Sequence, residues 1–145
     1  MPTTPQPSNR RRGPQRIYVL HPYCGQGRPG ERQTNKARIG LICRDIVRMG
    51  HIPISPIHAL SFLDDTVLMD RLDALRLSRT YIEMADTVWA FIIDASSIER
   101  KDPYGLRWVQ SDGCRADHDA AIQLQRPITY HVYEPLDCEA VPQGV

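Results

Sequence analysis

Residues 111–121, SDGCRADHDAA, place several side chains that can do chemistry within two turns of a predicted helix. A Ser-Asp-Gly turn signal leads directly into Cys114, Asp117, His118 and Asp119. Three chemistries are open to this segment: nucleophilic attack by a carboxylate, nucleophilic attack by a thiol with a histidine base, and metal ligation.

Asp117 is the strongest candidate because of the direction in which the helix points it. It shares one helix face with Ala121 and Leu124, since these residues are spaced by three and four positions. The two apolar residues must contact the sheet, so Asp117 also turns inward, close to the start of the helix. A carboxylate in such a place is costly to bury unless something pairs with it or uses it.

The start of the same helix is a predicted anion site. Ser111 and the backbone amides of Gly113 and Cys114 lie where unpaired N–H groups and the helix dipole attract a phosphate. Before it, residues 94–112 show no periodicity and form a long predicted loop, a feature that is usually functional or disordered. In this loop Trp108 could stack on a base beside basic side chains that meet phosphate, or could merely cover the end of the sheet.

Thiol catalysis and metal ligation each need several side chains close together, and the sequence spacing places only some of them side by side. Cys114 and His118 are four residues apart on one helix, so a thiol nucleophile with a histidine base is conceivable. If the loop after the first strand folds over this helix, His21 and Cys24 could complete a site of two cysteines and two histidines. We predict no metal and no cofactor, because the His-x-x-Cys spacing is not diagnostic and both residues suit ordinary loop positions.

These side chains need a scaffold, and the apolar periodicity predicts one. The predicted elements are a strand at 16–20, a helix at 35–50, an edge strand at 51–57, a helix at 63–85, a central strand at 87–93, a helix at 113–125 and a last strand at 128–133. This order predicts a single doubly wound α/β domain, flavodoxin-like or Rossmann-like, with a parallel sheet of four to five strands in the order 2-1-3-4 and helices on both faces. No G-x-G-x-x-G follows the first strand, so the dinucleotide fingerprint is missing. The ligand site is expected beyond the carboxyl ends of the strands.

The helical period also predicts which side chains are buried. The helix at 35–50, capped by Thr34 or Asn35, is expected to bury Ile39, Ile42, Cys43, Ile46 and Val47. The helix at 63–85, capped by the Asp64-Asp65 pair, is expected to bury Leu68, Leu72, Leu75 and Ile82.

Composition limits the class of protein. A chain of 145 residues with 41% hydrophobic and 24% charged residues fits one soluble domain. No apolar run approaches the roughly 18 residues that span a bilayer, and no secretory signal is found, so we expect no membrane partner and a cytoplasmic location. The four cysteines form no C-x-x-C pair, which indicates free thiols.

The predicted domain boundaries separate a folded body from two tails. Residues 1–15 form a disordered basic tail, residues 16–134 the α/β domain and residues 135–145 a C-terminal tail. The arginines of the first tail could bind nucleic acid weakly, whereas the near-neutral body argues against a nucleic-acid groove.

Several motifs occur in an order and at a spacing that resemble a known superfamily. They are IYVLHPYCGQG, Asn35 eight residues before Cys43, GHIPISPIHALSFLDD, ADTVWAFI and SDGCRADHDAA followed by RPI. Together they look like the nucleoside 2-deoxyribosyltransferase-like superfamily, and within it the small proteins of the DUF4406/DUF7768 type, over residues 16–133. The resemblance implies a glycosidic-bond hydrolase or deoxyribosyltransferase that acts on a nucleoside or nucleotide, and it implies a homodimer.

The resemblance also implies roles for individual residues. By position, Asp117 becomes the carboxylate that attacks C1′ of a deoxyribose, in a reaction that resembles retaining glycoside hydrolysis. Tyr18 takes the place of a tyrosine whose hydroxyl orients this nucleophile, and Ser111 with the Gly113 turn takes the place of a 5′-phosphate site. Asp94, at the end of the strand at 87–93, could protonate the departing base, and so could Asp112.

The loop after the first strand is expected to approach the sugar. His21, Tyr23 and Gly25 belong to its HPYCGQG sequence, in which glycine permits close contact with a ligand. A purely structural turn is the alternative for this loop.

Two departures from the family pattern leave the activity open. Asp117 is one methylene shorter than the glutamate it replaces, and a displacement of about 1 Å at a reacting centre can cost about a hundredfold in rate. Ser78 stands where the active relatives carry an acidic residue. The alternative function is a catalytically inactive module of the same fold that binds a nucleotide or a protein partner.

Overall fold

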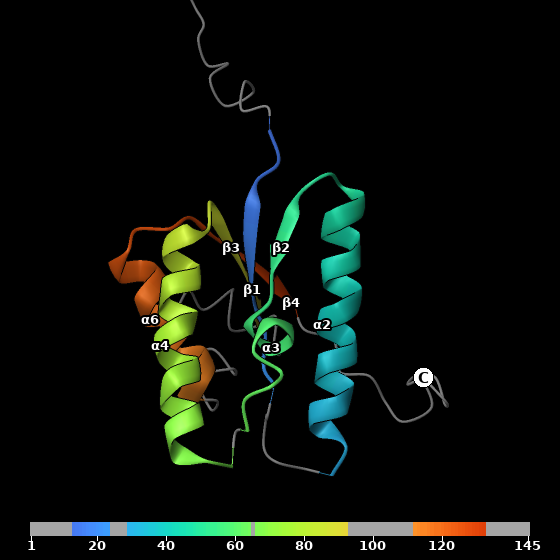
Figure 1. Ribbon diagram of the computed structural model, residues 1–145. Coiled ribbons are helices and arrows are strands. Elements are labelled where there is room, and N and C mark those ends of the chain that lie inside the picture. The colour runs from blue at the N-terminus through green and yellow to red at the C-terminus, as the bar shows by residue number, and fades with distance from the viewer. Residues whose placement is uncertain (1–12, 24–28, 65, 93–111, 133–145) are drawn as a thin grey trace, which may run out of the picture.

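The computed structural model describes residues 13–23, 29–64, 66–92 and 112–132 (Figure 1). Four parallel strands form one sheet in the order β2-β1-β3-β4, which confirms the predicted α/β topology. The strands are β1 (Arg16–Leu20), β2 (Ile52–Ile54), β3 (Thr87–Ile92) and β4 (Ile128–Val132), and the helices are α2 (Glu31–Arg48), α3 (Pro56–Ala59), α4 (Leu68–Met84) and α6 (Asp112–Gln123). Helix α2 covers one face of the sheet, and α4 and α6 cover the other (Figure 1). None of the helices in these ranges is long and apolar enough to cross a membrane.

Strand β1 is buried on both faces and divides the core in two. Ile17 and Val19 pack in the cluster under α2, whereas Tyr18 and Leu20 pack in the cluster under α4 and α6. Alternate strand residues point to opposite faces of a sheet, so the single run RIYVL supplies both layers. This alternation places Tyr18 beneath the helix that carries Asp117.

Strand β2 is a short edge strand. Pro53 lies in its centre, and a residue without an N–H donor is tolerated only where one side of the strand has no partner. The predicted strand at 51–57 is too long, because Pro56 occupies the first turn of α3 and Ser55 caps that helix by accepting a hydrogen bond from the His58 amide.

Helix α2 begins four residues earlier than predicted. Gly30, with φ of 79°, occupies its N-cap in the left-handed region that favours glycine. Asn35 is therefore inside the helix, and its side-chain amide donates a 2.8 Å hydrogen bond to the carbonyl oxygen of Tyr23. Ile39 and Ile46 are buried as expected, but Val47 is exposed.

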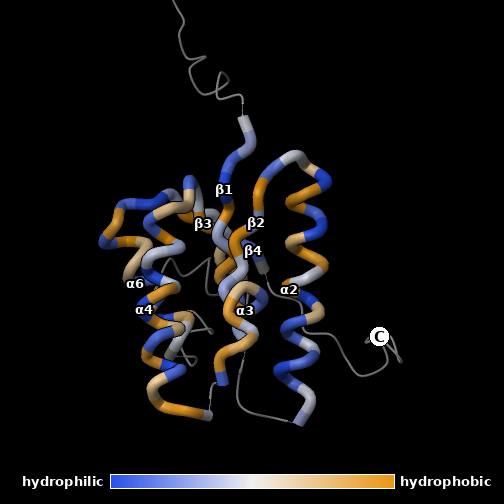
Figure 2. Tube along the Cα trace, viewed as in Figure 1, coloured by the Kyte–Doolittle hydropathy of each residue, from blue (hydrophilic) through white to orange (hydrophobic). Residues whose placement is uncertain are grey.

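Helix α4 differs from the prediction in both its start and its buried face. It begins at Leu68, because the Asp64 carboxylate accepts hydrogen bonds from Thr66 and closes a separate turn before the helix. Ser78 and Ile82 are its buried residues, whereas Leu68, Leu72 and Leu75, which were expected to be buried, are exposed. The start of α4 is coloured as hydrophobic in Figure 2, and its exposed residues include Leu68 and Met69.

Helix α6 spans Asp112–Gln123, whereas the predicted helix spans 113–125, so its start is one residue earlier and its end two residues earlier than predicted. Gln125, with φ of 60°, turns the chain out of the helix, and the Arg126 amide donates to the carbonyl oxygen of Ala121. The chain then enters β4, the second edge of the sheet.

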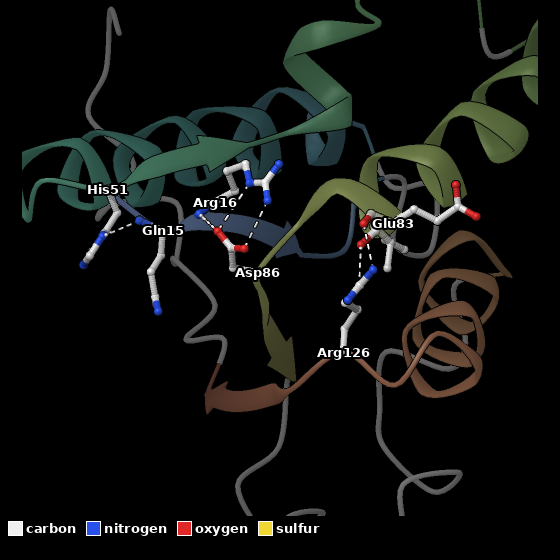
Figure 3. A network of polar contacts seen from close by, with 7 residues as sticks. Gln15, Arg16, His51, Glu83, Asp86 and Arg126 are labelled. Carbon is white, nitrogen blue, oxygen red and sulfur yellow. Dashed lines mark hydrogen bonds and ion pairs between the residues drawn. The ribbon is translucent and has the colours of Figure 1, made fainter. Parts of the chain in front are cut away.

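Polar contacts close the amino end of the sheet (Figure 3). Asp86 accepts a 2.7 Å hydrogen bond from the Arg16 amide and pairs with the Arg16 guanidinium at 3.2 Å. His51 accepts a hydrogen bond from the Gln15 amide, and the Arg126 guanidinium donates to the carbonyl oxygen of Glu83 at the end of α4. Asp86 therefore joins β1 to the start of β3 and lies away from the carboxyl end, which is consistent with a structural role.

Candidate functional site

A cleft of about 690 Å³ lies at the carboxyl end of β1, between the helices of the two faces. Its wall combines apolar side chains with charged and hydroxyl-bearing ones. The lining residues are Tyr18, Val19, Leu20, His21, Tyr23, Lys36, Pro56, Ile57, Leu60, Ser61, Leu63, Asp64, Asp70, Arg71, Ala74, Leu75, Ser78, Gly113, Cys114 and Asp117. This is where ligands are expected in an open parallel sheet, and the volume suits a small organic molecule.

Asp117 and Tyr18 meet inside this cleft. The Tyr18 hydroxyl donates a 2.6 Å hydrogen bond to Oδ2 of Asp117, which joins β1 to α6. Tyr18 is completely buried, so its ring cannot rotate away without disturbing the core. Among the described residues, no hydrogen bond is formed to the second oxygen, Oδ1.

Ser78 lies beside this pair. Its side chain lowers the pKa of Tyr18 and so opposes part of the rise that burial causes. Ser78 is itself buried on α4. The position that carries an acidic residue in the family pattern therefore contributes no carboxylate here.

Burial determines the protonation states of the Asp117 carboxyl and the Tyr18 hydroxyl. Burial raises the pKa of Asp117 from 3.8 to about 6, and the hydrogen bond from Tyr18 offsets part of that rise. Burial and the nearby Asp117 charge hold the pKa of Tyr18 well above its ordinary value of 10. At neutral pH the site therefore holds an ionised carboxylate and a protonated phenol, which is the state a carboxylate nucleophile requires.

His21 contributes a neutral ring to the same cleft. Burial lowers its pKa to about 4, and Nδ1 donates a 2.7 Å hydrogen bond to the carbonyl oxygen of Pro22. The ring also packs against Phe91, with centroids 5.6 Å apart. In this tautomer Nε2 carries no proton, and the ring is neutral at physiological pH.

Two cations enter the cleft from opposite faces of the sheet. Lys36 belongs to α2 and Arg71 to α4, and within the described ranges neither forms an ion pair. Two acidic residues on the wall have local partners, because Asp70 accepts from the Asp64 amide and Asp64 accepts from Thr66. The cations are therefore available to an anionic group of a ligand, such as a phosphate.

The sequence identified only some of these residues. Six of the residues that the sequence singled out line the cleft: Tyr18, His21, Tyr23, Gly113, Cys114 and Asp117. The predicted residues Gly25, Asp94, Trp108 and Ser111 lie outside the described residues. Lys36, Arg71 and the two wall aspartates were missed. Arg71 could have been found from its spacing, since it lies seven residues before Ser78 on the same helix face.

The thiol and metal alternatives gain no support from the geometry. Cys114 and His118 are both buried, and His118 Nε2 lies 2.9 Å from the Tyr130 hydroxyl, beneath α6. Burial also lowers the pKa of His118, which weakens it as a base. In the described part of the chain, no group of three or more potential ligands could hold a metal ion, and Cys24 lies outside that part.

A second hollow of about 590 Å³ lies beside β2, away from Asp117. Its polar groups include Ser55 and His58, whose side chains hydrogen-bond to each other at 2.8 Å. Burial raises the pKa of Cys43 in the same hollow, so its thiol stays protonated. These groups hold the start of α3 in place, and the carboxyl-end cleft remains the better candidate site.

The fold and the cleft together define a doubly wound α/β protein with a carboxylate–tyrosine pair at the carboxyl end of its first strand. A family model described as "Domain of unknown function (DUF7768)" matches residues 15–100, and the chain belongs to this family. The match includes β1, α2, β2, α3, α4 and β3, whereas Asp117 lies beyond it on α6. No curated protein matches the sequence.

Proposed function

We propose that the cleft binds a nucleoside or nucleotide and cleaves its N-glycosidic bond, with Asp117 as the nucleophile. The observation that carries the proposal is the Asp117 carboxylate held at 2.6 Å by a buried tyrosine inside a ligand-sized cleft. Burying a carboxylate is costly, and a site that orients and uses the charge accounts for that cost.

In this reaction Asp117 Oδ1 attacks C1′ of the sugar while the bond from C1′ to the base nitrogen breaks. The electron pair of that bond leaves with the base, which takes up a proton, and a covalent glycosyl ester forms on Asp117. Attack by water then gives hydrolysis, and attack by a second base gives transfer. Tyr18 keeps its proton throughout and holds Oδ2, so that Oδ1 points at the sugar.

The cations on the wall favour a phosphorylated ligand over a bare nucleoside. Lys36 and Arg71 line the cleft and can each bond to phosphate oxygens.

Base release tests the proposal directly. The protein is incubated with deoxyribonucleosides and their 5′-monophosphates, and free base is measured by chromatography. We expect release by the parent and by Asp45→Asn, an exposed position on α2, and none by Asp117→Asn. Mass spectrometry of quenched reactions should find the sugar attached to the peptide that contains Asp117. Release that persists in Asp117→Asn would refute the assignment.

A catalytically inactive nucleotide-binding module is the second candidate, and Ser78 is the observation that favours it. The side chain at this position lies beside Tyr18 and supplies no acid. This function predicts no base release from any substrate, together with thermal stabilisation by one nucleotide that persists in Asp117→Asn.

A further inference from the structure

Asn35 is a polar residue on the buried face of α2. It lies one turn before Ile39 and shares the buried side of the helix with Ile39 and Ile46, and it is only 1% exposed. Asparagine is a weak helix former, and burying its amide is costly unless the amide is hydrogen-bonded. A hydrophobic side chain would suit this position better, unless the amide makes a contact that such a side chain cannot make.

The amide of Asn35 makes a contact of this kind between α2 and the segment that follows β1. It donates a 2.8 Å hydrogen bond to the carbonyl oxygen of Tyr23. The end of β1 and the start of α2 lie at the same end of the molecule (Figure 1). Ile39 and Ile46 pack in the apolar cluster on the sheet, whereas Asn35, nearer the start of the helix, meets loop backbone.

This hydrogen bond joins two parts of the cleft wall. His21 and Tyr23 line the cleft from the segment after β1, and Lys36, the residue next to Asn35, lines it from α2. The His21 ring packs against Phe91, which fixes the first end of the segment. The hydrogen bond from Asn35 fixes the other end, at Tyr23, and sets its place relative to Lys36.

We propose that Asn35 is a positioning residue for the candidate site, which holds Tyr23 against α2 and thereby sets the affinity of the cleft for its ligand. The identity of that ligand, a nucleoside 5′-monophosphate, rests on the proposed function. Asn35 acts on the wall through Tyr23, so the binding energy it supplies is common to the bound substrate and the transition state. Loss of the contact should therefore raise KM and leave kcat nearly unchanged.

Two variants of the full chain test the effect on affinity. Asn35→Leu keeps about the volume of the side chain, Asn35→Ala shortens it, and neither can donate a hydrogen bond. Gln33→Leu, at an exposed position on α2, is the matched control. Calorimetry is carried out with each of the common deoxynucleoside 5′-monophosphates in turn. For a nucleotide that binds the parent, we expect both Asn35 variants to raise the dissociation constant about tenfold and the control to leave it unchanged.

Two further measurements separate positioning from a purely structural role. If the nucleotide releases its base, KM should rise by the same factor, whereas kcat should change less than about twofold. Without ligand, nitrogen-15 relaxation should show the backbone order parameter of Tyr23 falling from about 0.85 in the parent to below about 0.6 in the Asn35 variants.

Three results would overturn the proposal: an unchanged order parameter, an unchanged dissociation constant in a variant that circular dichroism shows to be folded, or a loss confined to kcat. A parent that binds none of the nucleotides would instead refute the proposed function. The order parameter of Tyr23 would then decide by itself whether Asn35 positions this wall.

Discussion

Replacing Asp117 with asparagine should make the protein more stable at neutral and alkaline pH. Asparagine keeps an oxygen that can accept the hydrogen bond from Tyr18, and it removes a charge that burial disfavours. Functional sites commonly carry such a stability cost, which a substitution that abolishes function relieves.

The size of this gain in stability, and its dependence on pH, follow from the pKa of Asp117. The pKa rises from 3.8 to about 6, and at about 1.4 kcal/mol per pKa unit this corresponds to on the order of 3 kcal/mol. The folded state binds this proton more tightly than the unfolded state does, so the group favours folding below about pH 4 and loses that contribution as the pH rises through about 6. Because Asp117 is only partly shielded from solvent, we expect Asp117→Asn to gain about 1–3 kcal/mol at about pH 8.

Urea denaturation followed by circular dichroism, repeated between about pH 4 and pH 8, measures this difference. The gain should shrink toward zero near pH 4, where the parent carboxyl is protonated. The exposed Asp45→Asn serves as the control and should give no comparable gain. If Asp117→Asn is as stable as the parent, or less stable, at about pH 8, the carboxylate is not held at a cost and the reasoning about the site fails.

Three further predictions concern other parts of the molecule. Tyr18→Phe removes the hydrogen bond that lowers the pKa of Asp117, so a carbon-13 NMR titration should place that pKa above about 6; an unchanged value would contradict the pairing. Arg71→Ala should weaken binding of a nucleoside 5′-monophosphate by about tenfold in calorimetry and leave the nucleoside unaffected; equal losses for both would exclude a phosphate contact. Ile82→Ala removes a fully buried core side chain and should cost about 2–5 kcal/mol in urea denaturation, and a loss below 1 kcal/mol would mean that the α4 core is packed differently.

The sequence predicts the topology and the inward direction of Asp117 because both depend on strong local periodicity. Alternating buried strands and amphipathic helices leave few arrangements, and spacing alone puts Asp117 on the face of Ala121 and Leu124. The observed order β2-β1-β3-β4 follows from this pattern, whereas the contact of Asp117 with Tyr18 was expected only from the family resemblance.

The predictions that were wrong concern elements whose packing partner cannot be read from the spacing of apolar residues. The stripe of Leu68, Leu72 and Leu75 is amphipathic, but a helical period cannot distinguish a face that packs on the sheet from a face that packs elsewhere. Lys36 was missed for a related reason, because its place in the cleft depends on how α2 packs against the sheet, and no local signal specifies that packing. The start of α2 depends on the left-handed Gly30, which competes with the side-chain caps that the sequence offers.

The contact between Tyr18 and Asp117 joins residues that lie 99 positions apart in the chain. During synthesis, β1 leaves the ribosome long before α6 exists, so the nascent chain carries the tyrosine in an apolar strand without the carboxylate that will pair with it. Closing so long a loop has a larger entropic cost than pairing β1 with β2 or β3, whose residues lie nearer to it in the chain. A ligand that needs both groups can therefore bind only to a finished molecule, and its binding would report that folding is complete.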